Sequence, residues 1–313
     1  MKASLAYFSQ VGRLVLHRFP LEIMKFRYEN HYAVGLLFFV ARVCYIMIMS
    51  RIIALCNQKG GVGKSTTAQN AAVFLSALGK RVLLVDLDPQ ANTTSGMGFN
   101  PRKLEKSLYE MLIGRATPEE VIKKTTILNL DIVPASPSLA GAGIELVDMP
   151  RREYKLREAL STVRHDYDFI VIDSPPSLGL LTINAITAAH KIIIPVQCEY
   201  YAMEGLADLL RTIQLVNTNL KAKAGIMGAV LTMYDRKSRL HRAVAKEIRR
   251  KFPGYVFGAI IPRNVSLAEA PSFGKTILQY DPYSHGAKAY RQLAQEIITM
   301  DDIGREERLR RHA

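Results

Sequence analysis

The sequence predicts an α/β protein in which a doubly wound, mainly parallel β-sheet forms a single domain. Short apolar runs rich in β-branched residues, the pattern of strands buried on both faces, recur along the chain and alternate with longer segments of helical pattern. Such alternation favours crossover connections and a parallel sheet covered by helices. The predicted strands are residues 51–56, 80–88, 130–134, 167–173, 191–196, 225–233 and 255–261.

The segments between these strands have apolar residues at helical spacing. Within residues 101–128, which have a helical and linking pattern, the pair Thr117-Pro118 is followed by two glutamates and predicts a helix start. No boundary of a second domain is visible between residue 51 and about residue 300. The predicted helical segments are residues 67–78, 101–128, 151–164 and 236–251.

The composition limits which binding partners and which cysteine-based sites can be expected. The 313 residues, 49% of them hydrophobic, suffice for a real core. A formal net charge of +14 favours a polyanionic partner, either nucleic acid or an anionic membrane surface. The cysteines Cys44, Cys56 and Cys198 lie far apart, which argues against a disulfide framework, a structural zinc or a cysteine-ligated cluster and fits a reducing cytosol.

Residues 1–50 do not fit the α/β pattern. Residues 33–49 are apolar except for Arg42, which is close to the minimum length of a membrane-spanning helix. A signal anchor, an interfacial helix and translated sequence upstream of the true start are the three interpretations. Because the first strand begins at Arg51 without a linker, and Met47 and Met49 precede it, we expect a spurious or dispensable extension before a working domain of residues 51–313. A membrane-surface segment is the alternative.

Residues 59–65 have the composition of a phosphate-binding loop between a buried strand and a helix. Glycines let consecutive backbone N–H groups point at one anion, and the helix N-terminus adds partial positive charge. Lys64 would neutralise the β- and γ-phosphates, and the Ser65 hydroxyl would hold Mg²⁺. The strict pattern is broken at Gln58, and Lys59 supplies a second lysine. The candidate nucleotide-binding residues here are Lys59, Gly60, Gly61, Val62, Gly63, Lys64, Ser65 and Thr66.

Carboxylates end two of the predicted strands. Asp86 and Asp88 close the second strand, and Asp173 closes the run that precedes Ser174-Pro175-Pro176. Acids at the carboxyl ends of parallel strands face the crevice where ligands bind, and a strand-end Asp supports Mg²⁺ in phosphate-loop enzymes. A purely structural role for Asp173 is the alternative. Together with residues 59–65, this pattern predicts a sheet of the phosphate-loop NTPase type.

The predicted helix 236–251 concentrates positive charge on one face. Its basic residues recur at spacings of three, four and three, while Leu240, Val244 and Ile248 on the opposite face are available for the core. An ordinary solvated face is the alternative. Because no acid interrupts the stripe, we expect it to contact nucleic-acid backbone, independently of sequence and with strong salt dependence. The candidate DNA-binding residues are Lys237, Arg239, Arg242, Lys246 and Arg249.

Six blocks of sequence resemble the ParA/Soj family of chromosome- and plasmid-partitioning ATPases. The resemblance covers residues 51–300 and none of residues 1–50. It implies ATP and Mg²⁺ as cofactors and a homodimer that sandwiches two ATP molecules, with Lys59 reaching the partner's ATP. The blocks are residues 58–65, 85–90, 171–177, 195–201, 261–265 and 269–272.

The resemblance also implies roles for individual residues. Lys59, Lys64 and Asp88 would be catalytic, with Asp88 orienting the attacking water. Ser65 would hold Mg²⁺, and Asp173 would support it through water. The adenine would be held by Pro262 and Asn264.

For the whole molecule the resemblance implies nonspecific double-stranded DNA and a ParB-like protein as partners, in a cytoplasmic, nucleoid-associated setting. Hydrolysis would release the dimer and hence the DNA. The chain departs from the family at Ser266, where relatives often carry a basic residue, and at Lys237, which aligns with their DNA-contacting arginine. Arg239 and Arg242 would replace the lost charge.

Three other functions are alternatives to this prediction. A MinD-like positioning ATPase would need a C-terminal amphipathic helix, whereas residues 301–313 are charged with almost no apolar face. A nitrogenase-reductase-like electron carrier would need cluster ligands that the cysteines do not supply. A membrane-linked tyrosine kinase of the same superfamily would need a C-terminal tyrosine cluster, which this sequence lacks.

Overall fold

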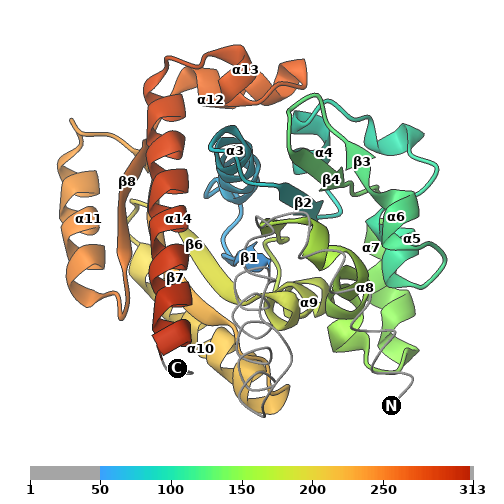
Figure 1. The fold of residues 1–313 in the computed structure, drawn as a ribbon. Coiled ribbons are helices and arrows are strands. Elements are labelled where there is room, and N and C mark those ends of the chain that lie inside the picture. The colour runs from blue at the N-terminus through green and yellow to red at the C-terminus, as the bar shows by residue number, and fades with distance from the viewer. Residues whose placement is uncertain (1–49, 311–313) are drawn as a thin grey trace, which may run out of the picture. The chain divides into compact units, whose positions relative to one another are not determined.

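Eight strands form one sheet in the order β3-β4-β2-β5-β1-β6-β7-β8 (Figure 1). The computed structural model describes the backbone of residues 50–310 and the side chains of residues 50–307, so the expectation for the N-terminal extension lies outside the described residues, Ser50 apart. The strands are β1 Arg51–Leu55, β2 Val82–Asp86, β3 Lys123–Lys124, β4 Leu130–Val133, β5 Phe169–Asp173, β6 Lys191–Gln197, β7 Gly225–Tyr234 and β8 Val256–Pro262.

The predicted mainly parallel, doubly wound sheet is confirmed. Every pair of neighbouring strands is parallel except β3 and β4, which are antiparallel. All seven predicted strands are present. β3 was not predicted, because a strand of two lysines has no hydrophobic pattern and exists only through its pairing with β4.

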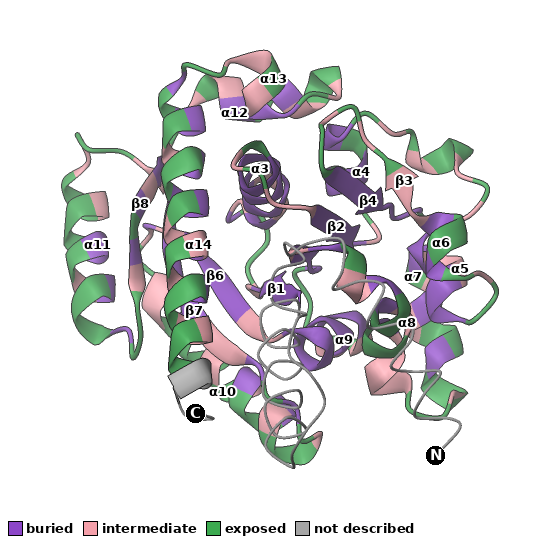
Figure 2. Cartoon of the chain, viewed as in Figure 1, coloured by how far each residue is buried: buried purple, intermediate pink, exposed green. Residues whose placement is uncertain are grey.

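Helices cover both faces of the sheet because successive strand residues point to opposite sides. Within β1, Ile52 and Ala54 join one buried cluster and Ile53 and Leu55 the other. The strands β1, β2, β4 and β5 are accordingly buried along their whole length (Figure 2). One face is covered by α5 Leu108–Leu112, α6 Pro118–Val121, α7 Leu139–Glu145, α8 Lys155–Val163, α9 Leu180–Ala188, α10 Ala202–Asn219 and α11 Arg239–Lys251. The other is covered by α3 Lys64–Ala77, α12 Val265–Glu269, α13 Ile277–Tyr280 and α14 His285–Arg310.

Residues 101–128 are less regular than predicted. They contain α5, α6 and β3 rather than a continuous helical link. The helix start at Thr117-Pro118 is confirmed, since α6 begins there with a capping box and with proline in its first turn. Short single-turn elements complete the chain: α4 Asn92–Gly96, η2 Pro101–Lys103, η3 Leu146–Asp148, η4 Arg152–Tyr154, η5 Arg164–Asp166 and η6 Ala270–Phe273.

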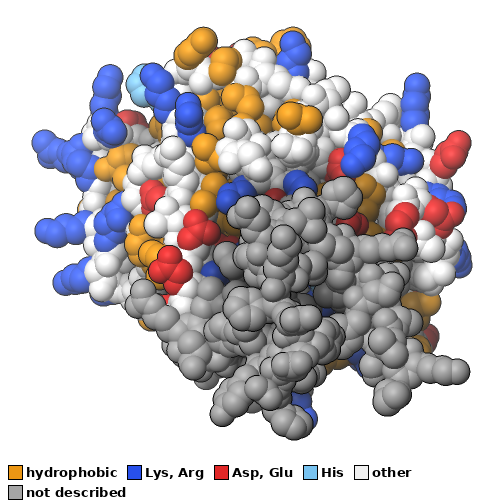
Figure 3. Space-filling view, in the orientation of Figure 1, with side chains coloured by type: hydrophobic (Ala, Val, Ile, Leu, Met, Phe, Trp, Pro, Cys, Tyr) orange, Lys and Arg blue, Asp and Glu red, His pale blue; other side chains and the backbone are white. Residues whose placement is uncertain are grey.

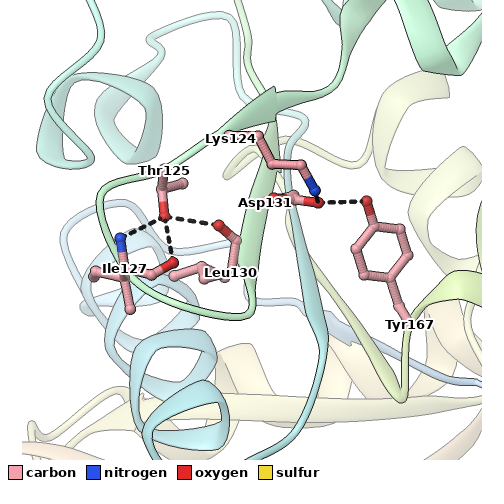
Figure 4. A network of polar contacts seen from close by, with 6 residues as sticks. All are labelled: Lys124, Thr125, Ile127, Leu130, Asp131 and Tyr167. Carbon is pink, nitrogen blue, oxygen red and sulfur yellow. Dashed lines mark hydrogen bonds and ion pairs between the residues drawn. The ribbon is translucent and has the colours of Figure 1, made fainter.

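A polar network holds the β3–β4 hairpin to the sheet (Figure 4). The Asp131 carboxylate accepts from Lys124 Nζ at 2.6 Å and from the Tyr167 hydroxyl at 2.8 Å. The Thr125 hydroxyl donates to the Leu130 carbonyl at 2.7 Å. These contacts replace the packing that a strand of two residues cannot supply, which explains why so short an edge strand forms.

Residues 50–302 form one compact unit. Residues 303–310 continue α14 as helix. Among residues 50–310, no helix is both long enough and apolar enough to cross a membrane.

Candidate functional site

The loops that follow the parallel strands meet at the carboxyl edge of the sheet. From β1 the chain passes over β5 to reach β2, and from β5 it passes over β1 to reach β6. This opposed winding separates the loops after the central strands and creates the crevice in which open α/β sheets bind ligands. The predicted phosphate loop follows β1. The strand-end acids lie at or just after the ends of β2 and β5, and the predicted adenine-binding residues lie at or just after the end of β8. All of them therefore lie along this one edge.

The phosphate loop is held open by neighbouring strands. Gly61 and Gly63 have φ of 74° and 83°, the left-handed conformation that glycine adopts without strain, and α3 begins directly after Gly63. The Thr232 hydroxyl of β7 donates to the Val62 carbonyl at 2.8 Å. Asn57 accepts from the Lys59 N–H at 3.0 Å and donates to the Pro195 carbonyl of β6 at 2.6 Å. The loop is therefore a fixed cradle for an anion at a helix N-terminus.

The two lysines of the loop point to different places. Lys64 is buried, and its Nζ donates to the Lys59 carbonyl at 3.1 Å within the loop. Burial lowers the pKa of Lys64, and the charges of Asp173 and Asp88 oppose that shift. Lys59 instead has a side chain that is 51% exposed and forms an ion pair with Glu199, which follows β6. Lys64 is thus buried within the loop, whereas the Lys59 ammonium is half-exposed and held by Glu199.

Asp86 and Asp173 occupy paired positions on β2 and β5, and both are fully buried. Asp86 accepts from the N–H and the hydroxyl of Thr94, each at 2.7 Å. Asp173 Oδ2 accepts from the Thr93 hydroxyl at 2.8 Å. Burial raises the pKa of both carboxyl groups; for Asp173, the Ser65 and Thr93 hydroxyls counteract the rise. Two buried acids side by side favour a cation next to them.

Asp173 Oδ1 is a buried oxygen without a hydrogen-bond partner among the described residues. Ser65 lies in the first turn of α3 and is near enough for its hydroxyl to stabilise the Asp173 carboxylate. A buried carboxylate oxygen without a hydrogen-bond donor costs folding free energy unless a water molecule or a metal-bound water donates to it. The donor set at this point, one hydroxyl and one carboxylate, suits Mg²⁺, which takes oxygen ligands and keeps several waters.

Asp88 is 6% exposed and lies at the mouth of the same crevice. Its Oδ1 accepts from the Gln90 N–H at 2.9 Å, which fixes the turn after β2. Its charge acts on Lys64, so the two side chains are electrostatic neighbours. Asp88 thus follows β2 at the carboxyl edge of the sheet, where its charge acts on a lysine of the phosphate loop.

Pro262 ends β8, and Asn264 follows it at the same edge. The side-chain oxygen Oδ1 of Asn264 accepts from the Leu267 N–H at 3.0 Å and caps α12. The N–H of Arg263, between them, donates to the Tyr234 carbonyl at 3.1 Å. Asn264 thus has a structural role as a helix cap, and its side-chain NH₂ group has no hydrogen-bond partner among the described residues.

The basic face of α11 is defined as the exposed residues Lys237, Arg239, Arg242, Lys246 and Arg249. In Figure 3, lysine and arginine side chains gather along the left edge, where Figure 1 places α11. Two members also bind backbone: Arg242 donates to the carbonyls of Arg236 and Lys237 at 2.6 and 3.3 Å, and Arg249 donates to that of Phe257 at 3.3 Å. Arg239 and Lys246 make no ion pair or hydrogen bond through their side chains within the described part of the chain.

Two predictions about this helix were wrong. α11 begins at Arg239 and not at residue 236, because Ser238 caps it and the Asp235 carboxylate accepts from the Lys237 N–H in a preceding turn. Leu240 does not enter the core and is 48% exposed. The buried stripe is centred on Val244, Ala245 and Ile248; each step of four residues rotates by about 40°, which turns Leu240 away from that centre.

Comparison with known proteins gives the family. A family model described as an AAA domain matches residues 50–226. The sporulation initiation inhibitor protein Soj of Bacillus subtilis is 52% identical over 249 residues, which span 80% of this chain and 98% of that protein. The chromosome partitioning protein ParA of Caulobacter vibrioides is 47% identical over 253 residues, 80% of this chain and 95% of the relative. The chain belongs to the ParA/Soj family of chromosome-partitioning ATPases.

Solved structures of related nucleotide-binding proteins share the fold of this chain. Cobyrinic acid a,c-diamide synthase from Mycobacterium smegmatis, with a bound ATP analogue and magnesium, is 38% identical, with a TM-score of 0.72 over 80% of this chain and 94% of that one. The cell division ATPase MinD of Pyrococcus furiosus is 28% identical, with a TM-score of 0.66 over 80% of this chain and 100% of that one.

Sequence reasoning missed four residues of this ParA/Soj-type site. Thr93 and Thr94 hold the buried acids, Glu199 pairs with Lys59, and Thr232 holds the phosphate loop. Glu199 stands inside one of the blocks that resemble the family, so the resemblance marked its region but not its partner. The three threonines have no sequence signal, because their roles depend on strand order.

Proposed function

We propose that this chain is a partitioning ATPase whose ATP-bound homodimer holds nonspecific double-stranded DNA. Hydrolysis to ADP and phosphate, stimulated by a ParB-like protein, dissociates the dimer and releases the DNA. The protein would work in the cytoplasm in association with the nucleoid. The identity to Soj and ParA supports this reading, and the separation of the two loop lysines carries it.

That separation suits a nucleotide-dependent dimer. Lys64 is buried and directed into its own loop, where it would neutralise the β- and γ-phosphates of ATP. Lys59 is half-exposed and held by the half-exposed Glu199, so it has the reach to meet a second subunit. A cation brought to the γ-phosphate in trans acts as an arginine finger does, because it stabilises developing charge only when the dimer forms.

The cofactor Mg²⁺ fits the residues present. Ser65 would hold the ion and Asp173 would support it through water, which would satisfy the unpartnered Asp173 Oδ1. When bound, the ion neutralises charge on the phosphates. Asp88 would orient the attacking water from the turn that its own side chain fixes. Pro262 and Asn264 would hold the adenine. The side-chain NH₂ group of Asn264 would be the donor, since the side-chain oxygen Oδ1 already caps α12.

The basic face of α11 supplies the DNA contact. Its positive charges are exposed, and Glu247, the acid of the helix, pairs with Lys251 away from the stripe. Contacts of this kind neutralise phosphates and carry no base information. Because Arg242 also supports the turn before the helix, Arg239 and Lys246 are the informative residues to change.

The test is retention on immobilised duplex DNA in Mg-ATP and in Mg-ADP. We expect retention in ATP alone, and a loss of at least about tenfold for Arg239→Glu with Lys246→Glu, at unchanged ATP affinity. Arg211→Glu is the matched control, because Arg211 is an exposed arginine on α10, outside the basic face. Undiminished retention of the double variant would refute the DNA role of α11. Retention on anionic vesicles instead of DNA would favour the MinD-like alternative.

A further inference from the structure

The end of β7 links the phosphate loop to the basic helix. Thr232 holds the loop through the Val62 carbonyl, at 2.8 Å. The next residue, Met233, has its terminal methyl 3.9 Å from the position that a Cβ on Gly63 would occupy. Five residues later, Ser238 caps α11. The connection between the loop and the helix is therefore short and continuous.

Met233 is held in a strained conformation. Its φ of 50° lies in the left-handed region, which a residue with a branched or long side chain rarely adopts. The strand pairing has a bulge at the same place: β7 advances by three residues, from Leu231 to Tyr234, where β8 advances by two, from Ile260 to Pro262. β-Bulges of this kind take up an extra residue and redirect the chain next to functional sites.

Beyond the bulge, the chain is clamped to the first turn of α11. The Asp235 N–H donates to His241 Nδ1 at 3.0 Å. Arg242 donates to the carbonyls of Arg236 and Lys237. The Tyr234 and His241 rings lie 6.3 Å apart. A displacement of residues 234–237 would therefore move the helix turn that carries Arg239 and Arg242.

We propose that Met233 is a strained hinge that couples occupancy of the phosphate loop to the first turn of α11. An anion in the loop binds the backbone N–H groups around Val62 and Gly63. Thr232 holds the Val62 carbonyl, and the terminal methyl of Met233 lies beside the space next to Gly63. The backbone at Met233 then has two conformations available, left-handed and extended, and the choice between them shifts Tyr234 and Asp235. A two-state element of this kind is the physical requirement for coupling two sites.

The consequence for DNA binding rests on the proposed function of α11, whereas the hinge itself does not. The first measurement therefore uses no DNA. It is backbone hydrogen exchange, followed by mass spectrometry, of peptides covering residues 234–243 with and without AMP-PNP and Mg²⁺. In the unmodified chain we expect the first turn of α11 to change its exchange rate at least about threefold on nucleotide binding.

Two variants interrupt the coupling at different points. Met233→Gly removes the strain, since glycine adopts both conformations freely, and should reduce the exchange response to less than half. His241→Ala removes the acceptor of the Asp235 N–H and should do the same with the bulge intact. Lys221→Gly is the matched control: Lys221 has the same φ of 50° but is exposed and lies before β7, so its response should be that of the unmodified chain.

The outcomes separate the hinge from the DNA proposal. If the unmodified chain shows no response in α11, or if both Met233→Gly and His241→Ala retain the full response at an equal fraction of dimer, the hinge is overturned. If the response is present and lost in the variants but the chain binds no duplex DNA, the hinge stands and the DNA role fails. Should Met233→Gly not fold, His241→Ala alone decides.

Discussion

Lys59 and Glu199 form an ion pair across the mouth of the phosphate loop, with side chains 51% and 42% exposed. The pair joins the loop after β1 to the segment after β6, so the lysine that would serve a second subunit is held by its own chain. Exposed ion pairs contribute about 0–1 kcal/mol, which makes this contact easy to exchange for a phosphate.

Glu199→Gln should therefore make dimerisation easier. Release of Lys59 would lower the ATP concentration at half-maximal dimer by about two- to fivefold, as measured by light scattering, because the competing pair is worth about 1 kcal/mol at most. Stability should be unchanged. Glu204→Gln, an exposed glutamate in the first turn of α10, is the control. An unchanged midpoint would mean that Glu199 does not compete for Lys59.

The two lysine variants should fail differently. Lys59→Ala should retain ATP binding and lose dimerisation and stimulated hydrolysis, since its ammonium is half-exposed and paired with Glu199 rather than buried in the loop. Lys64→Ala should also lose nucleotide affinity, because the buried ammonium lies within the loop. Equilibrium binding of a fluorescent ATP analogue and steady-state hydrolysis measure the two effects. Indistinguishable variants would contradict separate roles.

Thr93→Val tests the support of the buried Asp173 carboxylate. The change is nearly isosteric but removes the 2.8 Å hydrogen bond to Oδ2, and a buried acceptor without its donor costs about 1–3 kcal/mol. We expect that loss in the free energy of unfolding, measured with urea in EDTA. Thr162→Val, at an exposed position of α8, should change the free energy of unfolding by less than about 0.5 kcal/mol. Equal effects of the two changes would argue against a special role for Thr93.

The salt dependence of DNA affinity should report how many phosphates the basic face contacts. Each phosphate contact contributes about 0.9 to the slope of log affinity against log salt concentration. Arg239→Gln should weaken binding to every duplex sequence alike and lower the slope by about 1. Arg211→Gln should leave the slope unchanged. Fluorescence anisotropy across a salt series gives both numbers, and a sequence-dependent loss would contradict backbone binding.

Much of the fold could be predicted because each central strand is buried on both faces. Continuous apolar runs such as residues 169–172 and 192–196 are then required, and all seven predicted strands form. The failures fall where a residue's environment is set by distant segments. β3 exists through its pairing with β4, and Leu240 is exposed because the sheet covers only one narrow stripe of α11.

The sequence by itself determined the chemistry of the edge. The glycine-rich loop with two lysines and the acids at strand ends could be recognised from short stretches of sequence, because loop conformation and strand termination depend on neighbouring residues. Only the tertiary structure decided which groups meet: Thr93 with Asp173, Glu199 with Lys59, and β7 with both the phosphate loop and α11. These contacts join residues far apart in the chain, and they follow from strand order and from one bulge at Met233, which no local pattern encodes.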